Sequence, residues 1–451
     1  MQNNELIISV SGMRGVVGRA FTLEAAIRYV LAFDRVIPPG PICVGTDSRP
    51  SGSLFEEVAC AALKSCGRPV IRLGKMPTPT LGVVIRALRA SGGVMISASH
   101  NPPEYNGLKL FSAEGRIIPS TIGAEVLRRY HEGPQPECHL TDPLRFWGQD
   151  QFSPMALMYH LQAVLQTVEA TRIRARRFRV VLDCNHGVGG TLGRRLLEEL
   201  GCEVIVIGET PDGNFAHIPE PLAENVSSVL PFVRDREADI GFCQDPDADR
   251  LAIIDHTGRY LGEEYTLALC LDHVLRHRKG PVVINCATSL TSERIAQIHG
   301  APCYRTPVGE AHVVDGMLAQ SAIFGGEGNG GPIDPRVGLV RDSFVGMALV
   351  LDAMAERNAA VAELADQLPR FCMLKTKVPL APSALPRKFD ELEAAFPDAH
   401  SDRTDGLRLS WPDRWLVFRG SNTEPIVRLL AEAPTQSELD ELCQKAMSII
   451  R

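Results

Sequence analysis

The sequence of 451 residues lacks the features that mark secretion or insertion into a membrane. Its first residues, Met-Gln-Asn-Asn-Glu-Leu, contain neither the basic segment nor the apolar segment of a signal peptide. Its apolar runs are short, and the run from Val345 to Leu351 is far below the ~20 residues that a membrane-spanning helix needs. We therefore expect a protein that does not insert into a membrane.

An excess of positive charge is also missing. Lysine and arginine total 47 and aspartate and glutamate total 54, which gives a net charge of −7. This balance argues against a nucleic acid or an anionic membrane surface as a partner. Basic residues that bind an anionic ligand must then be concentrated at a local site.

The 12 cysteines include no Cys-x-x-Cys pair, so the sequence offers no redox or zinc motif of that kind. Several lie inside apolar segments, among them Cys43, Cys243 and Cys286, and are expected to be small buried hydrophobic residues. Unpaired thiols are typical of a reducing compartment. We expect a cytoplasmic protein.

Strands and helices alternate in three successive segments, each of which ends in a strand followed by a polar motif. These segments run from the strand at 41–45 to that at 93–97, from 178–183 to 238–243, and from 281–286 to 322–325. The polar motifs begin at Ser99, Asp245 and Glu327. The pattern predicts three similar α/β domains whose strand ends face a common centre.

The pattern changes after about Leu368, where strands at 407–410 and 415–418 and a final helix at 437–450 indicate a small α+β unit. A chain of this length exceeds a single core and should divide into domains of about 100 to 150 residues. We expect three similar α/β domains with mixed sheets and a smaller α+β C-terminal domain around a central active-site cleft. Their predicted limits are 1–150, 151–256, 257–368 and 369–451.

The motif after the first segment reads Ile-Ser-Ala-Ser-His-Asn-Pro-Pro-Glu-Tyr-Asn-Gly-Leu-Lys over residues 96–109. Its prolines exclude a helix, so Ser99 and His100 should lie on a loop at the carboxyl end of a buried strand, where open α/β sheets bind ligands. A serine there can act as a nucleophile or phosphate carrier, and His100 and Lys109 can move protons. In isolation, a surface turn would explain the same residues.

The second motif, Asp245-Pro-Asp-Ala-Asp-Arg250, places three carboxylates at alternate positions. In an extended loop these side chains point the same way and can bind one hard cation, and Mg²⁺ fits best. A calcium-binding EF-hand is excluded because Arg250 and His256 stand where it needs glycine and glutamate. Three acids without a cation would repel one another.

Three further segments carry polar groups among flexible residues. The glycine-rich loop at 325–331 contains Glu327 and Asn329, whose carboxylate and amide can bind sugar hydroxyls, although a plain glycine turn is an alternative. The segment Arg-Gly-Ser-Asn-Thr-Glu-Pro at 419–425, followed by Arg428, has the groups that bind phosphate, unless Arg419 pairs with Glu424. Near the start, glycines allow a tight loop that presents Arg14.

Together these motifs resemble, in order and from Arg14 to Arg428, those of the α-D-phosphohexomutases. The resemblance covers the active-serine loop, the metal loop, the sugar loop and the phosphate-binding loop, with lesser matches at 45–49 and 211–215. Departures from the family pattern are Pro246 for glycine, Asn329 for serine, Gly331 for histidine and Pro307 for lysine.

The resemblance implies a role for each motif. Ser99 would be the phosphoserine, and Mg²⁺ would be bound by Ser99, Asp245, Asp247 and Asp249. The implied catalytic residues are Ser99, His100, Lys109, Arg14 and Arg250. The implied substrate-binding residues are Glu327, Asn329, Arg419, Ser421, Asn422, Thr423 and Arg428.

The activity implied is that of a phosphohexomutase, which interconverts hexose 6-phosphate and hexose 1-phosphate through a hexose 1,6-bisphosphate that also serves as activator. The preferred expectation is a phosphoglucosamine mutase, on the resemblance of the start Ser-Gly-Met-Arg-Gly and of the loop at 325–331. Alternatives are a phosphomannomutase/phosphoglucomutase, a magnesium-dependent sugar phosphatase and a non-catalytic sugar-phosphate-binding paralogue. The expected partner is a small sugar phosphate, with no nucleic acid and no membrane, and the chain would be a monomer or homodimer.

Overall fold

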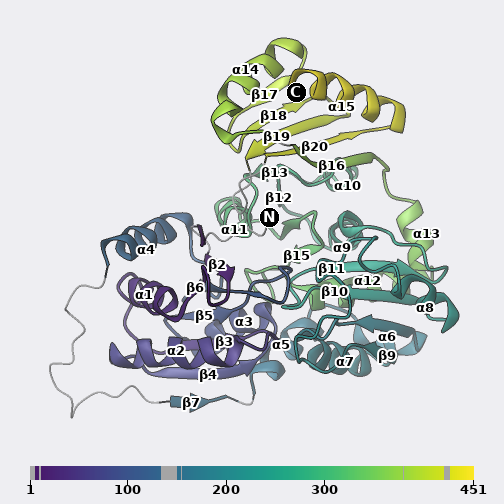
Figure 1. The fold of residues 1–451 in the computed structure, drawn as a ribbon. Helices are drawn as coiled ribbons and strands as arrows, with labels where there is room; N and C mark the ends of the chain where they lie inside the picture. The colour runs from purple at the N-terminus through teal and green to yellow at the C-terminus, as the bar shows by residue number, and fades with distance from the viewer. Residues whose placement is uncertain are drawn as a thin grey trace.

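The structure is a computed structural model that describes residues 6–9, 12–133, 150–153, 155–378, 380–420 and 427–450. Its strands form four sheets, one after another along the chain. The first sheet (purple) and the second (teal) lie side by side, and the third lies between them and the fourth (Figure 1). The predicted fold class is confirmed, while the exact domain limits stay a prediction.

The first sheet has the strand order β1-β2-β6-β5-β3-β4-β7. Its strands are β1 (Ile7–Ser9), β2 (Gly12–Val16), β3 (Ile42–Thr46), β4 (Val70–Lys75), β5 (Gly92–Ile96), β6 (Tyr105–Ser112) and β7 (Asp150–Phe152). The helices in this part of the chain are α1 (Leu23–Asp34), α2 (Gly52–Ser65), α3 (Thr78–Leu88) and α4 (Ser120–Glu132). Strands β3, β4 and β5 are parallel, and β6 runs antiparallel beside β5.

The second and third sheets share one topology, with orders β9-β8-β10-β11 and β13-β12-β14-β15. The strands are β8 (Arg179–Asp183), β9 (Glu203–Ile207), β10 (Ile240–Gln244), β11 (Leu251–Asp255), β12 (Val282–Asn285), β13 (Cys303–Thr306), β14 (Phe324–Glu327) and β15 (Gly331–Ile333). In each, three parallel strands are followed by an antiparallel fourth. The first sheet repeats this order as β4-β3-β5-β6.

Each polar motif therefore lies in the connection between the third, parallel strand of its unit and the antiparallel fourth strand. Ser99 follows β5, Asp245 follows β10, and Glu327 is the last residue of β14. The sequence predicted the three parallel strands of each unit, but not the antiparallel strand after each motif. Because carboxyl ends of parallel strands share one edge of a sheet, this topology presents all three motifs at equivalent edges.

Long helices join the second and third units. The helices after β7 are α5 (Ala156–Leu165), α6 (Ala170–Arg176), α7 (Gly189–Glu199), α8 (Val229–Asp235), α9 (Glu263–His277), α10 (Leu290–Ile298), α11 (Glu310–Ala319), α12 (Ser343–Arg357) and α13 (Val361–Asp366). One hydrophobic cluster includes Leu182 of β8, Leu271 of α9, Phe324 of β14 and Leu351 of α12. The α9–α12 pair thus lies in a core that both sheets share (Figure 1).

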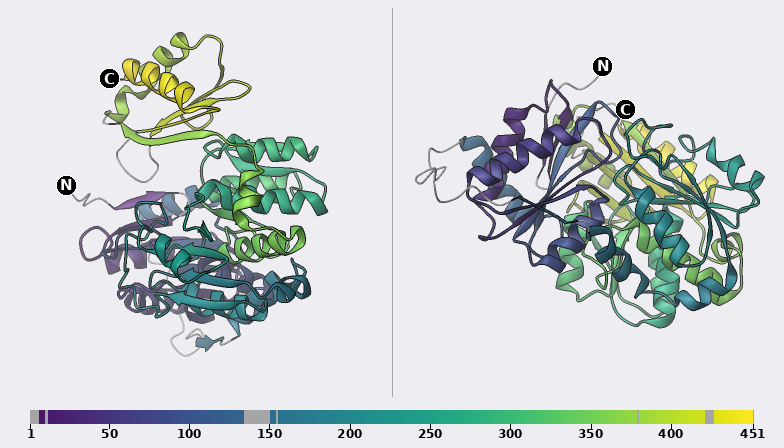
Figure 2. Two further views of the ribbon diagram at one scale, coloured as in Figure 1. Left: turned by 90° about the vertical axis from the view of Figure 1, so that its right-hand side faces the viewer. Right: turned by 90° about the horizontal axis from the view of Figure 1, so that it is seen from below.

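The fourth sheet is antiparallel throughout, with the order β16-β20-β19-β18-β17. Its elements are β16 (Cys372–Val378), a 3₁₀ turn (Pro382–Ala384), α14 (Leu385–Ala395), β17 (His400–Asp402), β18 (Leu407–Ser410), β19 (Trp415–Gly420), β20 (Val427–Ala433) and α15 (Gln436–Ile450). Helices α14 and α15 cover the face that points away from the rest of the molecule (Figure 2).

The opposite face of the fourth sheet contacts α10 through Trp415, Val417 and Leu430, which cluster with Leu290. A buried carboxylate completes this joint. Glu432 accepts hydrogen bonds from the Trp415 indole nitrogen (2.6 Å) and from the backbone nitrogen of Leu290 (2.7 Å), the first residue of α10. The fourth sheet is therefore positioned by a carboxylate at a helix N-terminus, where negative charge is stabilising.

The structure also bears on the expected absence of a membrane-spanning helix and on the cysteines. Within the described ranges, no helix is long and apolar enough to cross a membrane. The described cysteines are all unpaired, and Cys43 and Cys243 are completely buried, as predicted.

Candidate functional site

Ser99 lies buried just beyond β5, on the predicted loop. Its hydroxyl donates to Asp245 Oδ2 at 3.1 Å, and His100 Nδ1 lies 3.3 Å from the same hydroxyl. Its backbone φ is 51°, which is uncommon for a residue other than glycine, and its backbone nitrogen donates to the Ser97 hydroxyl at 2.9 Å. The loop thus directs the serine oxygen toward the aspartate motif of the second unit.

Arg49 fixes this loop through hydrogen bonds to its backbone carbonyl groups. Its side chain is completely buried, and its Nε pairs with Asp47 Oδ2 at 3.2 Å. Its guanidinium donates to the carbonyl oxygens of Ser99 (2.7 Å), Asn101 (2.5 Å), Pro102 (2.6 Å) and Tyr105 (3.0 Å). The sequence analysis included Arg49 only within the lesser family match at 45–49. Nothing in the neighbouring residues indicates that it binds a loop 50 residues away.

The three aspartates come together in a turn, and the prediction of an extended loop was wrong. Ala248 has a φ of 59°, and its nitrogen donates to the Asp245 carbonyl at 2.9 Å, so the backbone curls after β10. All three carboxylates are completely buried, and one oxygen of each lies within 4.8 Å of the others. The turn achieves the convergence that had been expected from alternation.

Cations surround these carboxylates. Lys109 Nζ lies 2.6 Å from Asp247 Oδ2 and 3.1 Å from Asp249 Oδ2, and Arg341 Nη2 lies 2.6 Å from Asp249 Oδ2. Burial and the two neighbouring aspartates raise the pKa of Asp245 well above its usual value. Burial also opposes ionisation of Asp249, but Arg341 and Lys109 outweigh it and lower the pKa of that carboxyl.

The aspartate motif fits a bound metal ion. Asp247 Oδ1 and Asp249 Oδ1 are buried without a hydrogen-bond partner. A buried carboxylate oxygen in that state is costly, and a hard cation that takes oxygen ligands, such as Mg²⁺, would satisfy it. The residues that could hold the ion are Asp245, Asp247 and Asp249, with Ser99 beside Asp245.

The two candidate proton-transfer groups differ in their surroundings. Desolvation at its partly buried position, together with Arg250 and Arg14, lowers the pKa of His100 well below the usual value. Desolvation also disfavours the charged form of Lys109, but Asp247 and Asp249 outweigh it and raise the pKa of that ammonium group. Beside the serine oxygen, therefore, lies an imidazole that favours its neutral form.

Arg14 lies on a strand, so the predicted tight loop was wrong. It is part of β2, directly opposite Gly107 of β6, and its Nη1 donates to Asn101 Oδ1 at 3.0 Å. A Cβ atom on Gly107 would lie 2.4 Å from the Met13 carbonyl oxygen, so glycine permits the close approach of two strands here. Arg250, in contrast, donates to Glu220 Oε1 at 3.1 Å, at the rim of the aspartate motif.

Glu327 is buried and already has protein donors on both oxygens. Asn285 Nδ2 donates to its Oε1 at 2.7 Å, the Gly309 nitrogen donates to the same atom at 3.0 Å, and Arg341 Nη1 donates to Oε2 at 2.8 Å. Asn329, next on the loop, has a buried Oδ1 without a hydrogen-bond partner. Glu327 thus positions the third motif, and Asn329 Oδ1 remains available to accept from a ligand hydroxyl.

Arg341 joins the second and third motifs, and sequence reasoning missed it. Besides Asp249 and Glu327, it contacts Glu310 Oε2 at 3.1 Å. A signal was present in the next residue, because Asp342 caps α12 by accepting from the nitrogens of Phe344 and Val345. The Asp342 cap marks the start of the apolar helix α12, so Arg341, the residue before the cap, lies where the chain enters the core.

A second group of charges lies on the fourth sheet. Arg419 pairs with Asp405 Oδ1 at 3.0 Å, a partner that the sequence did not indicate. Arg428 of β20 pairs with Arg419 of β19 on one side and with Lys377 of β16 on the other. The three cations therefore form a row across the sheet. Ser421, Asn422 and Thr423, and the alternative partner Glu424, lie outside the described residues.

Comparison with known proteins covers nearly the whole chain. Models of the phosphoglucomutase/phosphomannomutase alpha/beta/alpha domains I, II and III match residues 6–137, 158–258 and 263–371, and the C-terminal domain model matches 376–449. A "Phosphoglucomutase/phosphomannomutase" of Thermococcus kodakarensis is 33% identical over 448 residues, covering 97% of each chain. A "Probable phosphoglucosamine mutase" of Pyrococcus abyssi is 32% identical, covering 98% of this chain and 97% of that protein.

A solved structure agrees with these matches. A phosphoglucomutase/phosphomannomutase family protein from Burkholderia thailandensis has a TM-score of 0.83 and 25% identity, covering 100% of this chain and 97% of that one. Four domain models in order and relatives aligned over nearly the full length leave one assignment. The chain belongs to the phosphoglucomutase/phosphomannomutase family, within the α-D-phosphohexomutase superfamily.

Proposed function

We propose that the chain is a phosphohexomutase that interconverts hexose 6-phosphate and hexose 1-phosphate through a phosphorylated Ser99. The observation that carries this proposal is the contact of 3.1 Å between the Ser99 hydroxyl and Asp245, within a buried carboxylate cluster. A serine placed beside a cation-binding cluster can carry a phosphoryl group. Family membership supports the same activity.

The reaction moves one phosphoryl group at a time. The bond between phosphorus and Ser99 Oγ breaks as the free sugar hydroxyl bonds to phosphorus, and the hydroxyl proton ends on Ser99 Oγ. His100, 3.3 Å from that oxygen, is placed to relay the proton. The resulting hexose 1,6-bisphosphate turns over within the site, and its other phosphoryl group returns to Ser99 by the reverse exchange.

The charged residues around Ser99 have two proposed roles, stabilisation of negative charge and metal binding. Lys109, Arg14 and Arg250 would act as catalytic residues by adding positive charge near the transferring group. Asp245, Asp247 and Asp249 would hold Mg²⁺, which when bound stabilises the negative charge of the phosphoryl group. Because the three aspartate side chains are buried, and hydrogen bonds fix Asp247 and Asp249, they need little rearrangement during transfer.

Binding of the sugar phosphate is assigned to the third and fourth units. Asn329 Oδ1 would accept from a sugar hydroxyl beside Glu327, whose oxygens already have protein donors. The row formed by Arg419, Arg428 and Lys377 would attract the phosphate that is not being transferred. Ser421, Asn422 and Thr423 complete the proposed phosphate loop. This division places the two ends of the substrate against different domains.

The proposed substrate is glucosamine 6-phosphate, which would be converted to glucosamine 1-phosphate. A relative named as a phosphoglucosamine mutase supports it. A specific observation also favours a second candidate, a phosphomannomutase/phosphoglucomutase, because a relative at 33% identity has that name.

Replacing Ser99 tests the phosphoserine. We expect Ser99→Ala to abolish turnover with the fold intact, because the variant lacks the oxygen that carries the phosphoryl group. Intact mass spectrometry should find about one phosphate on the wild-type chain, which peptide mapping places on Ser99. Ser112→Ala, on β6 of the same sheet, should keep both phosphate and activity. Full activity of Ser99→Ala would disprove the mechanism.

Removal of the metal tests the aspartate cluster. We expect EDTA to abolish activity and Mg²⁺ to restore it, whereas Ca²⁺ should restore little because it prefers more ligands and longer bonds. Asp247→Asn should lose rate and require more Mg²⁺, while the exposed Asp235→Asn should behave as wild type. Steady-state rates across a Mg²⁺ titration measure both effects. Full activity after EDTA treatment would contradict the metal assignment.

Comparison of substrates tests the sugar. The ratio kcat/KM should be highest for glucosamine 6-phosphate when it is compared with the mannose and glucose phosphates, each primed with its 1,6-bisphosphate. A tenfold preference corresponds to about 1.4 kcal/mol of transition-state discrimination. A tenfold preference for mannose or glucose would replace the glucosamine assignment and leave the mutase proposal standing.

A further inference from the structure

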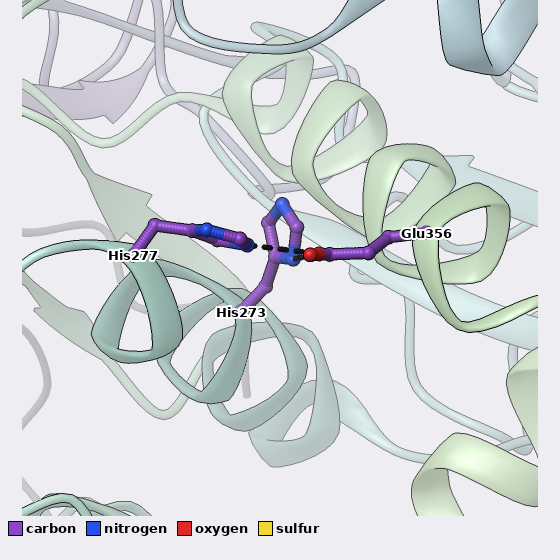
Figure 3. A group of neighbouring side chains, drawn as sticks. All are labelled: His273, His277 and Glu356. Carbon is purple, nitrogen blue, oxygen red and sulfur yellow. Dashed lines mark hydrogen bonds and ion pairs between the residues drawn. The ribbon is translucent and has the colours of Figure 1, made fainter.

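A second cluster of metal-binding side chains lies between α9 and α12, outside the site described above. His273 and His277 are one turn apart on α9, and Glu356 reaches them from α12 (Figure 3). One donor atom from each side chain lies within 4.8 Å of the other two. Two imidazoles and a carboxylate form a donor set that transition-metal ions prefer, unlike the all-oxygen set of the aspartate motif.

The donor atoms converge on one point. Glu356 Oε2 lies 2.8 Å from His277 Nε2 and 3.3 Å from His273 Nδ1. Ligands bound tetrahedrally at about 2.0–2.1 Å from a zinc ion are separated by roughly 3.4 Å. Only small side-chain movements would therefore bring these atoms to ligand distances.

The next layer of residues orients His273 for this task. Its other ring nitrogen, Nε2, lies 3.1 Å from Asp352 Oδ2, one helical turn before Glu356. Arg172 fixes Asp352 in turn, with Nη2 at 2.8 Å from Oδ1. A metal-binding histidine usually donates one ring N–H to a carboxylate, which leaves its other ring nitrogen free to bind the metal.

This arrangement leaves a polar atom unsatisfied. His273 Nδ1 is buried and has no hydrogen-bond partner, although it lies 3.3 Å from Glu356 Oε2. If Nε2 carries the proton that Asp352 accepts, Nδ1 is a buried acceptor that no protein donor satisfies. A bound cation would satisfy it.

We propose that His273, His277 and Glu356 form a binding site for a divalent transition-metal ion, of which Zn²⁺ is the best fit. The His277 side chain is 47% exposed and that of Glu356 27%, so the ion can enter from solvent and keep water as a fourth ligand. The ion ties the last turn of α9 to the last turn of α12.

The position of the site indicates a structural effect. Helices α9 and α12 each have 15 residues, so the cluster lies about 20 Å along them from their first turns. Arg341, which contacts Asp249 and Glu327, precedes α12 at that far end. The ion would stabilise the core shared by the second and third units and take no part in phosphoryl transfer.

Zinc binding can be measured on the full-length protein in excess Mg²⁺, which would occupy the aspartate motif. Equilibrium dialysis should find about one Zn²⁺ per wild-type chain, and Zn²⁺ should raise the melting temperature because it binds the folded state. His277→Ala should lose this ion and the temperature shift. The exposed histidine variant His256→Ala should retain both.

A second variant addresses the supporting residue. Asp352→Asn keeps all three ligands but weakens the orientation of His273, so we expect roughly 10- to 100-fold weaker Zn²⁺ binding. Co²⁺ titration should show visible absorption bands of tetrahedral coordination in the wild type and lose them in His277→Ala. The proposal is overturned if the wild type binds no Zn²⁺ under these conditions, or if His277→Ala binds it as tightly. The first result would mean that the two histidines hold Glu356 and Asp352 by polar contacts alone. The second would mean that the ion is bound elsewhere.

Discussion

The structure depends on the burial of three carboxylates at one point. Asp245, Asp247 and Asp249 are completely buried, and an isolated buried charge costs several kcal/mol. The cations that compensate come from other parts of the chain, since Lys109 lies on β6 of the first sheet and Arg341 precedes α12. The electrostatic balance of the site therefore requires the first three domains to be assembled together.

The repeated topology explains why these groups meet. In each of the first three units, the polar motif joins the third parallel strand to an antiparallel fourth strand. The serine, the aspartates and Glu327 thus occupy equivalent positions, and Arg341 links two of them directly. One structural unit, used three times, presents a serine, three aspartates and a glycine-rich loop at equivalent edges of its sheets.

The sequence predicted those parts of the fold that depend on local pattern. The parallel strands and their motifs were found because each is a short apolar run followed by polar residues. The antiparallel strands β6 and β15 were missed because Asn106-Gly107 and Gly331 are typical of turns. Here Gly107 lets two strands approach closely, and a Cβ on Gly331 would meet the Arg341 side chain. Arg49, Arg341 and Asp405 were missed as site residues because their roles arise from partners distant in sequence.

The central claim is that the phosphoryl group passes between Ser99 and the sugar and is not lost to water. It is tested most directly by ³¹P NMR of the wild-type enzyme with Mg²⁺, glucosamine 6-phosphate and a trace of the 1,6-bisphosphate. The account predicts that the 6-phosphate and 1-phosphate signals approach equilibrium while inorganic phosphate stays constant. Growth of inorganic phosphate in step with loss of substrate would contradict it and identify a phosphomonoesterase.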